Sequence, residues 1–489
     1  MATDVIVVGA GPAGMMLAGE LRLADVRVTV LERLAAPTGE SRGLGFTART
    51  MEVFDQRGIL GRLGEFETSD VGHFGGLPLD FGVLDGASFG GKTLPQSHTE
   101  AMLAGWADDV GVEFRRGCEL VGLTDDGDGV TAEVNGPNGI ELLRASYLVG
   151  CDGGRSTVRK VAGFDFPGTA ATMEMFLADF RGAETKPRMT GETVPGGMVM
   201  ATIPRAGVQR IIVCERGTTP KRRTRPLEFA EIADAWKRLV GEDISHAEPV
   251  WCSSFGDATR QATEYRRGRV LLAGDAAHIH LPAGGLGMNT SIQDSVNLGW
   301  KLAATVHGWA PPDLLDTYHT ERHAVGARLL MNTQAQGLLF LSGAEVAPIR
   351  DLFAELMRCE VVSRHLVGMV SGLDIRYPVG PGSHPLLGKR MPNRELTGGP
   401  RTYQLLHSGR GLLLDLTDDA ALRQCAAPWA DRIDVVTTRL STVEEDDPHA
   451  VLVRPDGHVA WANPGAGELV DSALARWFGA PSPTEAVGP

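Results

Sequence analysis

The sequence predicts an α/β protein whose first domain contains a buried parallel sheet. A second domain with its own β-sheet is inserted into the chain of the first, and a further domain follows at the C-terminus. Two apolar runs, at residues 4–8 and 269–273, each lead into a glycine-rich turn and then a helical pattern. Such runs are typical of strands that are buried on both faces of a parallel sheet. About residues 164–255 contain two predicted strands joined by a short hairpin connection and then an amphipathic helix. A break rich in glycine and proline at residues 380–382 precedes the last unit.

The first glycine-rich turn has the pattern GxGxxG and opens a helix. Gly11 would let the backbone approach a pyrophosphate, and Gly14 would let the helix pack against the strand. The positive end of the helix would then meet the phosphate charge. The turn contains Gly9, Gly11, Pro12, Ala13 and Gly14. It predicts a dinucleotide site.

An acidic residue stands at the end of the next predicted strand. The apolar residues 26–31 end at Glu32, close to the spacing of about 20 residues at which an acid binds an adenosine ribose. A free 2′-hydroxyl suits this carboxylate, and a 2′-phosphate does not. Strand, turn, helix, strand and acid in this order predict a Rossmann-like domain, with FAD and NAD as alternative ligands.

The second glycine-rich turn, Gly274-Asp275, favours FAD. A carboxylate facing a pyrophosphate would be repelled, so we expect Asp275 to accept hydrogen bonds from neutral hydroxyls. The ribitol chain of a flavin offers such hydroxyls, and NAD has no ribitol. The loop at residues 282–289 then enters a helix whose positive end would point at the flavin ring. Backbone N–H groups there would stabilise a reduced flavin, which is anionic around N1.

A third motif lies between the two turns, where residues 152–159 have the pattern DGxxSxVR. With both turns, it makes the chain resemble the single-component (group A) FAD-dependent aromatic hydroxylases, the family built like para-hydroxybenzoate hydroxylase. The resemblance covers about residues 1–375 and implies an FAD-binding domain of the glutathione-reductase type. The family often has Ala-His where this chain has Gly154-Arg155, a departure that concerns the details of cofactor handling.

Residues 166–171, 280–285 and 382–388 resemble the polyketide-tailoring branch of this family, and within it the angucycline hydroxylases. The resemblance implies that an oxygen atom is inserted into a planar, multi-ring phenol or quinone, in this subgroup usually at C-12. It implies FAD as cofactor, with NADPH or NADH as a transient electron donor. In the family, reduced FAD and oxygen form a flavin C4a-hydroperoxide, which an electron-rich ring carbon attacks.

The resemblance also assigns roles to residues. The ADP half of FAD would lie against the first turn, Glu32 and Arg33. Asp152 would take part in the interplay of flavin and nicotinamide, and Asp275, next to Gly274, would hold the ribitol or the pyrophosphate. The remaining cofactor residues would be Arg42, Gln96, Pro282, Gly285, Leu286, Gly287, Met288 and Asn289. Among these, Arg42, Pro282 and Gly285 are expected to position the flavin and to shape the environment of the hydroperoxide. We expect neither a side-chain base nor a metal.

Other chemistries lack the residues that they need. His278 and His280 have no Cys, Asp or Glu at a metal-ligand spacing beside them, so we expect packed or solvent-bonded histidines. No HExxH or GxSxG motif occurs, which leaves a hydrolase without a nucleophile. The six cysteines include no CxxC pair, which indicates reduced thiols and argues against a disulfide reductase.

Charge and hydropathy exclude further classes of partner. The net charge of −14 argues against nucleic acid, whose phosphates demand a basic face. No apolar run reaches the roughly 18 residues that a membrane span needs. The N-terminus enters the first strand without the features of an export signal. We therefore expect a cytoplasmic protein that binds neither nucleic acid nor membrane. The resemblance implies a polycyclic aromatic small molecule and molecular oxygen as its partners, and we expect a monomer or homodimer.

The chain is expected to form three domains. They are an FAD-binding domain at 1–165 and 256–375, a substrate-binding β-sheet domain at 166–255 and a thioredoxin-like domain at 380–489. In the middle domain, Met175, Met198 and Met200 form either an adaptable wall for a wide aromatic ligand or plain core. In the last domain, Cys425 stands alone, so dithiol chemistry is excluded.

The sequence favours an aromatic monooxygenase over the other functions that share its cofactor motifs. A hydroxylase of a small phenol would differ only in substrate. A flavin oxidase or dehydrogenase would keep the FAD contacts without needing the motif at residues 152–159. A non-catalytic carrier with a flavin fold would be colourless.

Overall fold

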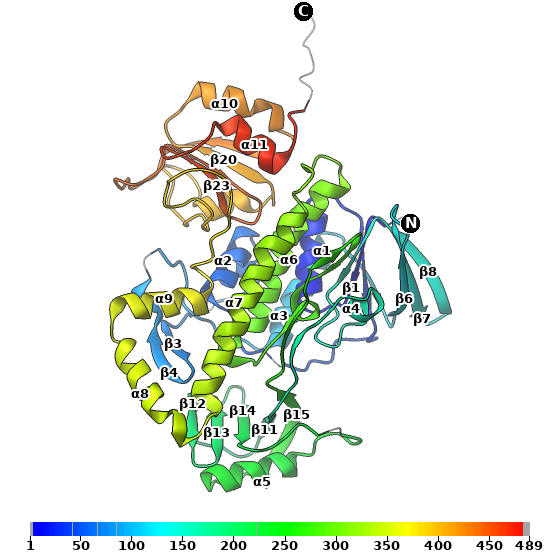
Figure 1. Cartoon of the computed structure of the whole chain (residues 1–489), viewed down its shortest axis with the longest axis vertical. Coiled ribbons are helices and arrows are strands. Elements are labelled where there is room, and N and C mark those ends of the chain that lie inside the picture. The colour runs from blue at the N-terminus through cyan, green and yellow to red at the C-terminus, as the bar shows by residue number, and fades with distance from the viewer. Residues whose placement is uncertain (1–2, 42, 66, 85, 222, 483–489) are drawn as a thin grey trace, which may run out of the picture.

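The computed structural model describes residues 3–482, apart from residues 42, 66, 85 and 222 (Figure 1). Its central six-stranded sheet has the order β17-β18-β9-β1-β2-β5, and all neighbours are parallel except β17 and β18. The strands are β1 (Val5–Val8), β2 (Val28–Glu32), β5 (Glu113–Arg116), β9 (Tyr147–Gly150), β17 (Arg266–Arg267) and β18 (Val270–Leu272). The buried parallel sheet predicted from the two apolar runs is therefore confirmed.

Four helices pack beside this sheet (Figure 1). Helix α1 contacts β1 and β2, α3 and α6 pack on α1, and α7 packs on α6. They are α1 (Pro12–Leu23), α3 (Gln96–Asp109), α6 (Leu286–Val306) and α7 (Asp316–Leu341). The backbones approach closely at glycines: a Cβ atom on Gly299 would lie 2.5 Å from Glu20 Cβ, and one on Gly19 would lie 2.2 Å from the Trp106 ring. The helix predicted at the end of the loop 282–289 is α6, which begins earlier than expected, at Leu286.

A five-stranded antiparallel sheet with the order β12-β13-β14-β11-β15 lies at one end of the molecule (Figure 1). Its strands are β11 (Glu174–Arg181), β12 (Arg188–Val194), β13 (Gly197–Ala201), β14 (Gln209–Glu215) and β15 (Glu248–Gly256). Helix α5 (Phe229–Val240) covers one face, where Trp236 packs with Val199 and Val213. Along β13, Met198 and Met200 alternate with these core residues and so lie on the other face.

Smaller sheets complete the N-terminal part of the chain. They are β3 (Val71–Phe74) with β4 (Leu77–Asp80), β6 (Glu119–Asp125) with β7 (Val130–Gly136) and β8 (Gly139–Ala145), and β10 (Gly168–Thr169) with β16 (Thr259–Gln261) and β19 (His278–Ile279). The remaining helices here are α2 (Ala48–Gln56), α4 (Thr157–Val161), α8 (Ala347–Leu356) and α9 (Glu360–Ser371).

The C-terminal sheet, with the order β21-β20-β22-β23, lies at the opposite end of the molecule from α5 (Figure 1). Its elements are β20 (Gly411–Asp415), α10 (Ala420–Ala426), β21 (Ile433–Thr437), β22 (Ala450–Val453), β23 (Val459–Asn463) and α11 (Val470–Phe478). Helix α10 ends at Ala426, because Pro428 lacks the N–H that the next turn needs. β22 and β23 form an antiparallel hairpin.

These observations confirm an α/β fold with several sheets. Within the described ranges, no helix is both long and apolar enough to cross a membrane.

Candidate functional site

The first glycine-rich turn joins β1 to α1, and its glycines have different surroundings. Gly9 has φ +106°, and a Cβ atom there would lie 2.5 Å from the Cys151 carbonyl oxygen. A Cβ atom on Gly14 would lie 1.9 Å from the Gly9 carbonyl oxygen. One on Gly11 would meet no described atom within 4 Å. The fold therefore requires Gly9 and Gly14, whereas Gly11 borders open space at the N-terminus of α1, where Pro12 takes the first helical position.

Glu32 ends β2 beside this turn, as the sequence predicts. Its carboxylate accepts hydrogen bonds from the backbone N–H groups of Ala10 and Leu34, both at 2.9 Å. These bonds hold the carboxylate at the turn, and its remaining lone pairs are free for hydroxyls of a ligand. Arg33 is exposed next to it.

Asp152 follows β9 and lies against the first turn, since a Cβ atom on Gly9 would be 3.0 Å from Asp152 Cα. Its Oδ2 accepts hydrogen bonds from the backbone N–H groups of Thr157 (2.6 Å) and Val158 (3.1 Å). Its Oδ1 is buried and has no hydrogen-bond partner in the part of the chain that the structure describes. A buried acceptor without a partner is costly, so this oxygen fits a ligand hydroxyl.

The last arginine of the middle motif joins it to the second turn, a contact that the sequence did not predict. Arg159 Nη1 donates to the Ala276 carbonyl (2.8 Å), and Nη2 donates to the Gly154 carbonyl (2.8 Å). In the second turn, Gly274 has φ +63° and is buried, while the Asp275 side chain is exposed. Asp275 is thus available to the hydroxyls of a ligand.

The loop before α6 supplies a third open segment. Pro282 and Gly285 are exposed, and a Cβ atom on Gly285 (φ +68°) would meet none of the described atoms within 4 Å. Leu286, which was predicted in this loop, is instead the first residue of α6, and its side chain packs in an apolar cluster with Leu329 and Val367. Only the backbone of Leu286 therefore faces the loop's open side.

Asn289, in the first turn of α6, joins this loop to the segment at residues 43–47. Its Nδ2 donates to the carbonyls of Gly45 (3.1 Å) and Gly285 (2.9 Å), and its Oδ1 accepts from Thr47 N (2.9 Å). Gln96 Oε1 accepts from Gly43 N at 3.0 Å.

Met288 also approaches residues 43–47, since a Cβ atom on Gly43 would lie 3.6 Å from its Sδ. A Cβ atom on Gly287 would lie 3.3 Å from His280 Nε2. Three distant parts of the sequence therefore meet here, and two of them contain predicted residues, Gln96 in one and Met288 with Asn289 in the other. Arg42, predicted beside them, lies outside the described residues.

A buried polar network behind the second turn was missed by the sequence analysis. Asp294 Oδ2 accepts from Gly274 N (3.1 Å) and bonds His278 Nε2 (2.8 Å), and Asp294 Oδ1 accepts from Arg322 Nε (2.6 Å). Arg322 Nη1 donates to the Tyr377 hydroxyl (2.8 Å). The available signal was a charged residue within each of two otherwise buried helices, Asp294 in α6 and Arg322 in α7. Charged groups are rarely buried without partners, so each of them indicates a buried partner.

The two predicted histidines are packed, as the sequence indicates. His278 is held by Asp294, and His280 Nδ1 lies 2.7 Å from the Leu281 carbonyl oxygen. Burial lowers the pKa of His280 to about 4, so this ring is neutral at physiological pH. The residues that the structure describes contain no group of three or more potential metal ligands.

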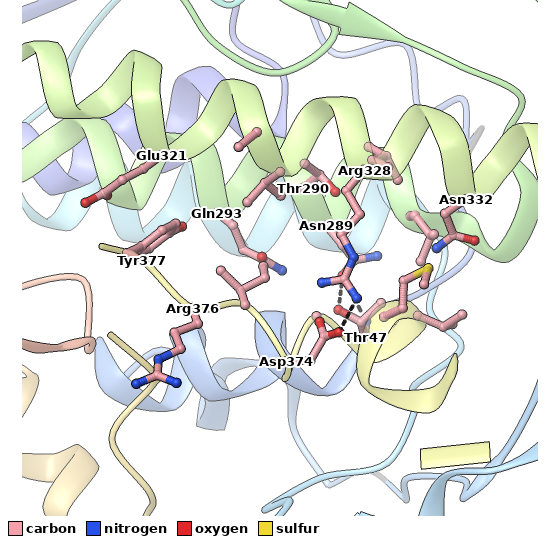
Figure 2. Close-up of a pocket in the computed structure, with 18 of the residues that line it drawn as sticks. Thr47, Asn289, Thr290, Gln293, Glu321, Arg328, Asn332, Asp374, Arg376 and Tyr377 are labelled. Carbon is pink, nitrogen blue, oxygen red and sulfur yellow. Dashed lines mark hydrogen bonds and ion pairs between the residues drawn. The ribbon is translucent and has the colours of Figure 1, made fainter. Parts of the chain in front are cut away.

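A cavity of about 200 Å³ lies between α6, α7, α9 and residues 372–378 (Figure 2). Figure 2 shows Asn289 and Gln293 in its lining and an ion pair between Arg328 and Asp374, whose atoms are 2.6 Å apart. Leu286 and Asn289 are the only predicted cofactor residues in this lining. The cavity therefore borders the loop that begins at Pro282 and the start of α6, here called the flavin-side loop, but not the first glycine-rich turn.

Glu321 predicts a pH dependence of stability. Burial alone would raise its pKa, but Arg454 and Lys301 outweigh burial and hold the pKa below the ordinary value of 4.5. The folded state therefore prefers the ionised carboxylate, and this stabilisation is lost as pH falls below 4.5. We expect the urea midpoint of the wild type to fall in this pH range. The midpoint of the Glu321→Gln variant should be lower at neutral pH and should change less with pH. Equal slopes for both proteins would contradict this assignment.

The geometry fits an extended flavin dinucleotide. Open space borders Gly11 at one end and Gly285 at the other, and the unpaired Asp152 oxygen and the exposed Asp275 carboxylate offer acceptors to hydroxyls along the way. NAD would leave Asp275 without the ribitol that this acidic turn suits.

Comparisons with known proteins agree with this geometry. Residues 2–333 match the family model described as "FAD binding domain", and residues 384–481 match "Aromatic-ring hydroxylase, C-terminal". The chain is 63% identical to CabE, described as an aromatic hydroxylase from angucycline biosynthesis, with a TM-score of 0.96 over 98% of this chain and 100% of CabE.

Two further relatives span nearly the whole chain. The structure of BexE shares 65% identity and a TM-score of 0.95 over 99% of this chain and 100% of BexE. A rifampicin monooxygenase of Streptomyces venezuelae is 46% identical over 98% of this chain and 99% of its own length. The resemblance stated from the motifs is confirmed, FAD is the cofactor, and the chain belongs to the family of FAD-dependent aromatic-ring hydroxylases.

Proposed function

We propose that this monooxygenase consumes NAD(P)H and hydroxylates a polycyclic aromatic polyketide of the angucycline type, at C-12. The similarity to CabE over nearly the full length of both chains carries this proposal. NADPH or NADH serves as a transient donor, and molecular oxygen is the co-substrate. When bound and reduced, FAD supplies the activation of oxygen.

In this proposal, the two ends of FAD are held by different elements. Gly11 and the N-terminus of α1 bind the pyrophosphate, and Glu32 accepts hydrogen bonds from the adenosine ribose. Asp152 Oδ1 accepts from a hydroxyl, as does Asp275 from the ribitol. The flavin ring lies against the loop that begins at Pro282.

The residues around the ring supply position and polarity. The N-terminus of α6 would face the ring and stabilise the negative charge of reduced flavin, as would the backbone of Gly285. Arg42, expected to position the flavin, lies outside the described residues. We propose that none of the described side chains acts as a base. Burial lowers the pKa of His280 to about 4, which makes this ring a weak base, and burial raises the pKa of the Cys214 thiol to about 11, so it carries no thiolate at neutral pH.

The five-stranded sheet covers the substrate in this proposal. Met175 is a core residue that packs with Leu281 and Ala283 of the flavin-side loop. Met198 is half-buried against the same cluster, and Met200 lies two positions along the same face. Half-buried, adaptable side chains at this place suit a wide aromatic ligand.

A Trp at position 198 is expected to raise KM for a multi-ring substrate about tenfold, since overpacking typically costs ~1–3 kcal/mol. Steady-state kinetics of the Met198→Trp variant measure this effect, and its FAD content should stay at the wild-type level. Met189→Trp is the matched control, because Met189 lies in the same sheet and is 41% exposed. If both variants behave alike, Met198 does not contact the substrate.

The proposed domain division follows the sequence. Residues 1–165 and 256–375 bind FAD, residues 166–255 bind substrate, and residues 380–489 form a thioredoxin-like domain, supported by the strand order of the C-terminal sheet. All six cysteines are free thiols, which suits a cytoplasmic enzyme. We propose a monomer or homodimer.

Substrate-stimulated NADPH oxidation tests the function. The panel contains simple phenols, rifampicin and polycyclic naphthoquinones of the angucycline type, and the mass of each product is recorded. We expect the last group to give products heavier by one oxygen atom. Efficient conversion of small phenols alone would make the protein a small-phenol hydroxylase, and hydrogen peroxide alone would indicate a flavin oxidase. A colourless preparation would indicate a carrier.

A further inference from the structure

The hairpin turn between β22 and β23, residues 454–458, inserts into the FAD-binding part of the molecule through buried charges. Arg454 donates to both carboxylate oxygens of Glu321 on α7, at 2.6 and 2.9 Å, and also pairs with Asp456. Asn297 on α6 donates to Asp456 Oδ2 at 3.1 Å. Arg454 is fully buried. Water screens the ion pairs of an ordinary exposed interface, whereas it does not reach the ion pairs of this buried contact.

The same turn also contacts α2, which directly follows residues 43–47 at the flavin side. Arg49 Nη2 donates to the Asp456 carbonyl (2.9 Å), and Arg57 Nη2 donates to the Pro455 carbonyl (2.7 Å). A Cβ atom on Gly457 would lie 2.5 Å from Gln56 Oε1. The turn thus fixes α2 by two charge-assisted bonds, one of them from Arg57 just after the helix, and by the close approach of the Gly457 backbone to the Gln56 side chain.

A second path leads from the turn to Gly274. The Tyr377 ring lies 4.4 Å from the His458 ring, and the Arg454 guanidinium lies 5.2 Å from the Tyr377 ring centre. The Tyr377 hydroxyl accepts from Arg322, which holds Asp294, which in turn accepts from Gly274 N. Every side chain on this path is buried.

We propose that the 454–458 turn is a positioning element for FAD, which sets the separation between α2 and the Gly274-Asp275 turn from the far end of the chain. This inference rests on the proposed placement of FAD. Helix α2, which follows residues 43–47 at the flavin side, and the Gly274-Asp275 turn are both linked to the 454–458 turn of the C-terminal sheet. The C-terminal sheet therefore contributes to cofactor geometry without touching the cofactor.

The test compares two arginines of the C-terminal sheet region. Arg454→Met removes the cation at the interface. Arg423→Met is the matched control, because Arg423 pairs with Asp415 and Asp418 within the C-terminal unit. The holoenzymes are diluted, FAD release is followed by flavin fluorescence, and the visible flavin spectrum and thermal midpoint are recorded. We expect Arg454→Met to weaken FAD binding about tenfold with an altered flavin spectrum, and Arg423→Met to lower only the thermal midpoint.

Asp456→Asn keeps the side-chain volume and serves as the second interface variant if Arg454→Met does not fold. It should also weaken FAD binding and alter the spectrum. Wild-type FAD affinity in a folded interface variant, or an equal loss in the Arg423→Met protein, would overturn the inference. The proposed function fails separately, if the wild-type holoenzyme yields no oxygenated product.

Discussion

The Gly11→Val variant is expected to fold as the wild type does and to bind no FAD. Its side chain would enter the open space beside α1, where no described atom lies within 4 Å. Gly11 has φ −79° and ψ −179°, an extended conformation that valine adopts readily. The loss of two charged hydrogen bonds to the pyrophosphate would cost about 3 kcal/mol or more, over 100-fold in Kd. Flavin absorbance after purification and circular dichroism measure the two effects.

Gly14→Ala is the matched control at the same turn. Its Cβ atom would lie 1.9 Å from the Gly9 carbonyl oxygen, so the helix and strand would have to move apart. We expect Gly14→Ala to lower both the stability and the FAD content. Gly11→Val should lower the FAD content alone. Normal FAD content in Gly11→Val would mean that the pyrophosphate lies elsewhere.

The Asp294→Ala variant is expected to lose about 3–5 kcal/mol of stability, because it leaves a buried arginine uncompensated. Arg322 and Asp294 are both fully buried, with Nε and Oδ1 2.6 Å apart. The variant also removes the acceptor for Gly274 N, so FAD content should fall. Urea denaturation measures the first effect and flavin absorbance the second.

Asp126→Ala is the control for the loss of a carboxylate from an ion pair. Asp126 and its partner Arg144 are about half exposed at the surface. Surface pairs contribute little, so the urea midpoint should stay at the wild-type value within error. A wild-type midpoint in Asp294→Ala as well would show that Arg322 finds other partners.

The sequence predicts the cofactor motifs well because each of them is local. β1, its glycine turn and α1 follow one another directly, so the period of the apolar residues and the spacing of the glycines suffice to place them. The same holds for the turn after β18 and for α6, although α6 begins at Leu286, within the predicted loop.

The interior network could not be predicted, because its partners are far apart in the sequence. Arg454 and Glu321 are separated by 133 positions, and Arg49 and the Asp456 carbonyl by 407. A single charged residue in a helical pattern does not show whether it faces water or a buried partner. Leu286 illustrates the same limit, since a residue expected in the glycine-rich loop is instead the first residue of α6 and turns its side chain into the core.

The central claim is that this chain uses bound FAD to insert one atom of molecular oxygen into a polycyclic aromatic compound. Turnover under ¹⁸O₂ with NADPH and an angucycline-type substrate, followed by mass spectrometry, tests it most directly. We predict a product that carries one ¹⁸O atom in the wild type and no product in Gly11→Val. A wild-type product whose new oxygen comes only from water would contradict the account.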